Sequence, residues 1–102
     1  MFHRRFADVI ERQLDLFERE HAGLIRECEA AERAYDRADR DEAEARYGEY
    51  VDLVEEGTEA LADLRDHYAA TLAEGDDEQY EAAFNRAVAK RLSRFALEIE
   101  NR

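Results

Sequence analysis

A carboxylate and an imidazole stand three residues apart at Glu18 and His21, a spacing that places both side chains on one face of a helix. Together they offer an oxygen and a nitrogen donor, which iron, manganese and zinc accept in proteins. His21 also falls on an apolar stripe with Phe17 and Leu24. The residue therefore has two interpretations, a metal ligand or a partly buried, hydrogen-bonded histidine of the core, and the sequence leaves both open.

The Glu18-x-x-His21 spacing resembles that of the ferritin-like di-iron carboxylate bundles, where two such motifs and two further glutamates line the core. The resemblance covers this short motif. It implies iron or manganese at a site to which a second copy contributes the second motif, with Glu56 or Glu59 as additional ligands. Gly57 lies between these glutamates and would either leave room for such a site or let two helices approach closely.

A second set of acidic residues has the order Glu55-Glu56-x-x-Glu59 and then Glu74-x-x-Asp77. This order resembles the signature of the all-α nucleotide pyrophosphohydrolases, the family that includes MazG. The resemblance implies that these carboxylates hold Mg²⁺ around the phosphates of a nucleotide. The stretch between the two half-motifs is predicted to be unbroken helix, which would separate Glu59 from Glu74 by about 22 Å.

The composition narrows the choice of partners. The 102 residues carry 27 acidic and 15 basic side chains, a net charge of −12, so we expect neither nucleic acid nor an anionic membrane as a main partner. No apolar run approaches the roughly 18 residues of a membrane span, and we recognise no signal peptide. The single cysteine, Cys28, fits a cytoplasmic protein, and the strong preference for arginine over lysine suggests a prokaryotic source.

Apolar residues recur at alternating steps of three and four along the chain, which predicts three helices at about residues 2–38, 42–73 and 77–101 of a single domain. The stripe changes phase near residue 40, and Gly75 marks the second break. Short connections between long helices favour antiparallel neighbours. We therefore expect an all-α, elongated, antiparallel three-helix bundle that runs up, down and up, with coiled-coil-like heptad seams.

The third predicted helix is too short to cover the tip of the hairpin formed by the first two. The side chains left uncovered there form our predicted interface: Ala31, Tyr35, Ala38, Tyr47 and Tyr50. No serine, threonine or cysteine has a histidine at a useful spacing for catalysis. We expect a non-catalytic protein without a cofactor that associates through helix–helix contacts, as a homo-oligomer or with another helical protein.

One basic stripe stands out in this acidic chain. Arg86, Lys90 and Arg94 are spaced by four, with Arg91 beside them. Counting levels along antiparallel helices places this stripe beside acidic residues of the first helix, Glu11, Asp15 and Glu18, and of the second, Glu59, Asp63 and Asp66. We expect ion pairs between helices or between subunits here, rather than an anion-binding site.

Overall fold

The computed structural model describes residues 5–102, so the start of the first predicted helix, at residues 2–4, lies outside the described residues. From residue 5 onward all regular structure is helical. The elements are α1 (Ala7–Glu20), α2 (Ala22–Arg37), α3 (Arg40–Ala69), α4 (Asp76–Arg91), the 3-10 turn η1 (Ser93–Phe95) and α5 (Ala96–Glu100). The molecule measures 51 × 25 × 22 Å along its principal axes, which confirms the prediction of an elongated all-α chain.

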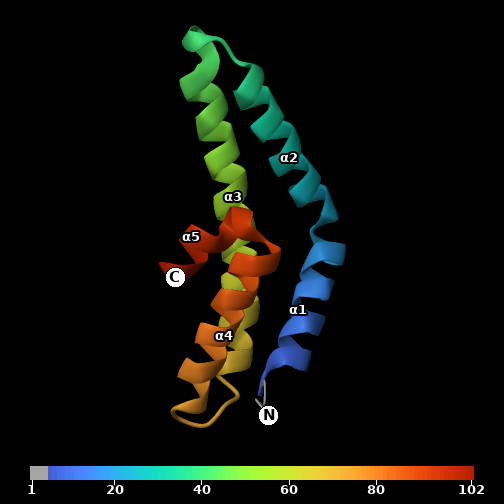
Figure 1. Cartoon of the computed structure of the whole chain (residues 1–102), viewed down its shortest axis with the longest axis vertical. Helices are drawn as coiled ribbons and strands as arrows, with labels where there is room; N and C mark the ends of the chain where they lie inside the picture. Colours follow the sequence, from blue (N-terminus) through green and yellow to red (C-terminus); the bar gives the residue numbers. More distant parts are fainter. Residues whose placement is uncertain (1–4) are drawn as a thin grey trace.

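The helices α1 to α4 run roughly along the long axis of the molecule (Figure 1). α1 and α2 follow one another along one side, α3 returns beside them, and α4 turns back along the lower part of α3. α5 leaves the upper end of α4 at an angle. The upper parts of α2 and α3 therefore extend beyond the C-terminal helices, and we call this extension, residues 31–50, the arm.

The helix predicted over residues 2–38 is divided at His21, whose backbone has φ −116° and ψ 26°. The His21 amide still donates to the Phe17 carbonyl at 2.8 Å, and the His21 carbonyl still accepts from the Ile25 amide at 3.0 Å. The break is therefore a kink within a continuing hydrogen-bond pattern. Gly23 follows two residues later, but a Cβ atom there would meet nothing within 4 Å, so the kink does not depend on glycine at this position.

The change of phase predicted near residue 40 is confirmed by a two-residue link between α2 and α3. The carbonyl of Asp39 accepts hydrogen bonds from the amides of Glu42 and Ala43, both at 3.0 Å, and so starts the new helix. α3 then continues without a break to Ala69, four residues short of the predicted end. Gly75, at φ 92°, supplies the left-handed backbone conformation that precedes α4.

The helix predicted over residues 77–101 is divided at Leu92, where φ is −130° and ψ is 56°. The break directs the chain toward α3, so that Phe95 and Ile99 become buried. The Phe95 ring lies against Gly57, where a Cβ atom would be 2.8 Å from Cζ of the ring and closer still to Cε1. Packing at Gly57 therefore accounts for a break that no glycine or proline marks.

A buried arginine joins the three C-terminal helices. Arg65 of α3 is 3% exposed, and its guanidinium donates to the side-chain oxygen of Asn85 and to the carbonyl of Ile99, both at 3.1 Å. Its Nε also donates to Asp66 at 2.8 Å. Because these bonds satisfy the buried cation, the short α5 is held in place by α3.

Candidate functional site

Glu18, the carboxylate of the predicted metal motif, is bound by an arginine of α4. Arg91 donates to the two oxygens of Glu18 at 2.7 and 3.2 Å and to Oδ1 of Asp15 at 2.5 Å. These hydrogen bonds, of which the bond to Glu18 has the largest effect, raise the pKa of Arg91, so its guanidinium stays positively charged. The predicted pairing of the basic stripe with the first helix is confirmed for Arg91.

The other predicted metal ligands do not join Glu18 in one chain. The His21 ring is stacked on Phe17, with centroids 4.9 Å apart, while Glu56 and Glu59 are exposed on α3. Within residues 5–102 no three His, Cys, Asp or Glu side chains gather in a group that could hold a metal ion. The space at Gly57 is occupied by the Phe95 ring. An iron or manganese site completed by a second copy stays a prediction.

The acidic half-motifs that resemble the pyrophosphohydrolase signature lie on different elements. α3 continues from Glu59 to Ala69, about 15 Å farther along the axis, before the chain turns toward Glu74. Asp77 lies in the first turn of α4, where its Oδ1 accepts from the amides of Gly75 and Glu78 at 3.1 and 2.9 Å. Asp77 thus has a local structural role, and the Mg²⁺ site that the resemblance implies stays a prediction.

Cys28 lies inside the core and is 0% exposed. Burial raises the pKa of its thiol, which lowers the fraction of reactive thiolate. Cys28 therefore packs as a small apolar side chain on the buried face of α2.

The arm presents a cluster of three aromatic rings, Tyr35, Tyr47 and Tyr50, which we call the tyrosine cluster. The centroids of Tyr35 and Tyr47 lie 5.3 Å apart, and those of Tyr47 and Tyr50 lie 6.4 Å apart. Tyr35 is 39% exposed and Tyr47 is 52% exposed, whereas Tyr50 is half-buried. The other two predicted interface residues, Ala31 and Ala38, are half-buried on α2 and at its end. The cluster therefore exposes aromatic surface on the arm.

Arg94 closes the lower end of the tyrosine cluster. Its guanidinium carbon lies 5.6 Å from the centre of the Tyr50 ring, and it donates to the Tyr50 hydroxyl and to Glu32, both at 3.3 Å. Because Arg94 follows the end of α4 by three residues and contacts Tyr50, the tyrosine cluster lies directly beside the C-terminal segment.

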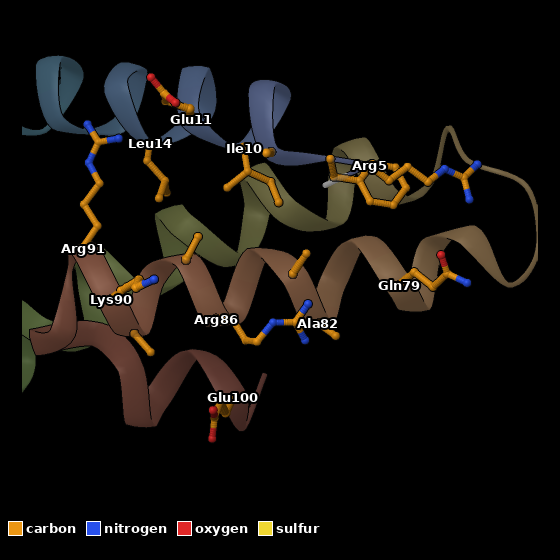
Figure 2. Close-up of a pocket in the computed structure, with 15 residues that line it drawn as sticks. Arg5, Ile10, Glu11, Leu14, Gln79, Ala82, Arg86, Lys90, Arg91 and Glu100 are labelled. Carbon is orange, nitrogen blue, oxygen red and sulfur yellow. The ribbon is translucent and has the colours of Figure 1, made fainter. Parts of the chain in front are cut away.

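A second surface feature is a groove over α4, bordered by α1 on one side and by α5 on the other (Figure 2). Its apolar lining comes from Ile10 and Leu14 of α1 and from alanines of α4. Arg86 and Lys90 lie on α4 in the middle of this α4 groove, while Glu11 and Glu100 lie at its two edges. Neither Arg86 nor Lys90 forms an ion pair with another residue of the described chain.

No known protein family, curated protein or solved structure matches this chain. None of the helices within residues 5–102 combines the length and the apolar character that a membrane crossing requires. Function must therefore be inferred from the arm and from the α4 groove.

The two surfaces differ in charge. The arm contains seven acidic and four basic residues, whereas residues 82–97 contain four basic residues and no acidic one. This basic segment includes the last turns of α4, where the partial negative charge of a helix C-terminus stabilises cations. The basic stripe can be recognised in the sequence. The groove around it cannot, because it depends on the angle at which α5 leaves α4.

Proposed function

We propose that this protein is a non-catalytic helical protein that acts through helix–helix association, and that the arm is its contact surface. The observation that carries the proposal is the exposed pair Tyr35 and Tyr47 at the end of an elongated molecule. Tyrosine is enriched in protein interfaces because its ring supplies apolar area and its hydroxyl tolerates water. Two such rings in contact form a surface that a partner helix can cover.

We infer that α1, α3 and α4 pack as an antiparallel three-helix bundle with coiled-coil-like seams, and that the arm is its two-helix extension. In the lower part of the molecule α3 packs against both α1 and α4. The arm, by contrast, consists only of parts of α2 and α3. Two helices alone leave part of each apolar stripe uncovered, so a partner helix would supply the missing layer. That helix belongs to a second copy of this chain or to another helical protein.

The experiment that tests the proposal is sedimentation equilibrium of the purified protein across the micromolar range. We expect the mass per particle to rise with concentration for the unaltered chain. The double substitution Tyr35→Ser and Tyr47→Ser should remove this rise, because it removes the aromatic surface. Both rings are substantially exposed, so the variant should keep its helical circular dichroism.

Leu97 provides the matched control, since it is 72% exposed and lies on α5, away from the arm. Leu97→Ser should leave the association unchanged. A tyrosine variant that associates as strongly as the unaltered chain would contradict the proposal, and a loss of association in Leu97→Ser alone would move the contact surface to α5.

A further inference from the structure

We propose that two copies of the chain pair side by side and antiparallel, so that the arm of each copy lies in the α4 groove of the other. This inference rests on the proposed function, because it assigns the arm its partner. It names the occupant of the groove as residues 31–50 of a second copy. Four observations support it: position along the molecule, charge, available area and the adjacency of the two surfaces.

The positions of the two surfaces match. Tyr47 lies 22 residues before the end of α3 at Ala69, about 33 Å up the long axis, and Arg86 lies 10 residues into α4, about 15 Å up from the same end. These two heights add to about 48 Å, close to the molecular length of 51 Å. Two antiparallel copies with their ends level therefore bring the tyrosine cluster of each beside Arg86 of the other.

The charges also match. Arg86 and Lys90 in the middle of the α4 groove have no ion-pair partner in the described chain, and both are exposed. On the arm, exposed carboxylates flank the exposed tyrosines: Asp36 follows Tyr35, and Glu44 precedes Tyr47 by one helical turn. Docking the acidic arm in the basic groove pairs these charges and opposes the repulsion between two chains that each carry a charge of −12.

The available area is sufficient for a specific dimer. A stable interface buries about 800 Å² on each partner, which corresponds to a strip about 40 Å long and 20 Å wide. The molecule is 51 Å long and 25 Å wide, so one long side provides this area when the copies overlap over most of their length. A contact between arms alone would overlap for a much shorter distance.

The two surfaces are also neighbours along the molecule. Arg91 lines the α4 groove, and Arg94, three residues later, reaches Tyr50 of the tyrosine cluster. The groove and the cluster thus follow one another along the molecule. A two-fold axis perpendicular to the long axis then produces two identical arm–groove contacts and a closed dimer rather than a filament.

Lys90 allows a direct test, because it is the single lysine of the chain. A zero-length carbodiimide reagent joins a lysine amine to a carboxylate in contact with it. We expect a covalent dimer in which mass spectrometry finds Lys90 joined to Asp36, Asp39 or Glu44. Lys90→Arg is the matched control, since it keeps the charge and the dimer but removes the amine, so this product should disappear.

A charge exchange supplies the second test. The groove variant, Arg86→Glu with Lys90→Glu, and the arm variant, Asp36→Lys with Glu44→Lys, each place like charges in contact. Each variant alone should raise the dissociation constant of the dimer by at least about tenfold. A mixture of the two should form a heterodimer, because both of its contacts are again complementary. All four positions are exposed, so folding should be unaffected.

The outcomes separate this inference from the proposed function. A chain that remains monomeric, or a covalent dimer in which Lys90 is joined to residues of the other chain outside 31–50, would overturn the antiparallel dimer. Charge variants that dimerise normally, while Tyr35→Ser with Tyr47→Ser does not, would also overturn it but leave association through the arm intact. If the tyrosine substitutions have no effect either, the proposed function fails as well.

Discussion

Replacing Gly57 by alanine tests the contact that places the C-terminal segment on α3. The added Cβ atom would lie 2.8 Å from Cζ of Phe95 and closer still to Cε1. Phe95 is 1% exposed and packs edge-to-face on Phe17, with centroids 5.8 Å apart, so the ring has little room to move. Overpacking of this kind costs about 1–3 kcal/mol, whereas alanine gains about 1 kcal/mol over glycine in a helix interior.

Gly48 lies on the same helix and provides the matched control, because nothing lies within 4 Å of a Cβ atom at that position. Gly48→Ala should therefore show the gain in helix propensity alone. Because both variants share this gain, the difference between their unfolding free energies isolates the overlap with Phe95. We expect Gly48→Ala to be more stable than Gly57→Ala by about 1–3 kcal/mol, or by at least about 4 °C in melting temperature.

The assay is urea and thermal unfolding followed by circular dichroism, at one protein concentration for all variants. Phe95→Leu removes the ring, so adding Gly57→Ala to Phe95→Leu should cost less than adding it to the unaltered chain. A Gly57→Ala variant that is stabilised as much as Gly48→Ala would refute the claim that the Phe95 ring requires glycine at position 57.

Two further predictions concern buried polar groups. Burial raises the pKa of Tyr80 from 10.0 to about 12. As the pH rises, the unfolded chain therefore loses the phenol proton before the folded chain does. The free energy of unfolding should be highest below pH 10 and should fall by about 2–3 kcal/mol between pH 10 and 12. Tyr80→Phe should flatten this pH dependence in urea unfolding, although it also removes the hydrogen bond to Gln13, and an unchanged slope would contradict the assignment. Arg65→Met leaves Asn85 and the carbonyl of Ile99 without their donor, so the unfolding free energy should fall by about 2–3 kcal/mol in the same assay; a variant as stable as the unaltered chain would show that these bonds contribute nothing.

The features of the fold that follow from local patterns could be predicted from the sequence. The alternating steps of three and four specify helices, the change of phase near residue 40 locates the first turn, and Gly75 locates the second. The breaks at His21 and Leu92 could not be predicted, because neither residue type interrupts a helix by itself. The Leu92 break accompanies the packing of Phe95 on Gly57 and on Phe17, and the His21 ring stacks on the same Phe17, so both breaks lie beside contacts that join residues far apart in the chain.

The candidate site also has one part that the sequence predicts and another that it does not. The length of each helix predicts that the hairpin tip lacks a third helix, and Tyr35 and Tyr47 are exposed there. Their role as an interface stays a prediction. The α4 groove was not foreseen, because it depends on the turn at Leu92 that moves α5 aside. At Gly57 the sequence is compatible with room for a metal site or with a close approach of two helices, and the structure places the Phe95 ring there.

The packing of Phe95 on α3 also determines which parts of the fold can form first during synthesis. The arm joins neighbouring segments through a two-residue link, so it can close as soon as the ribosome has released the first half of the chain. The lower core requires Phe95 and Ile99, which are synthesised about 45 to 50 residues after the arm, a delay of roughly two to ten seconds at ordinary rates of translation. During that interval the apolar stripes of α1 and of lower α3 are without their final cover, whereas both segments of the acidic arm have already been synthesised.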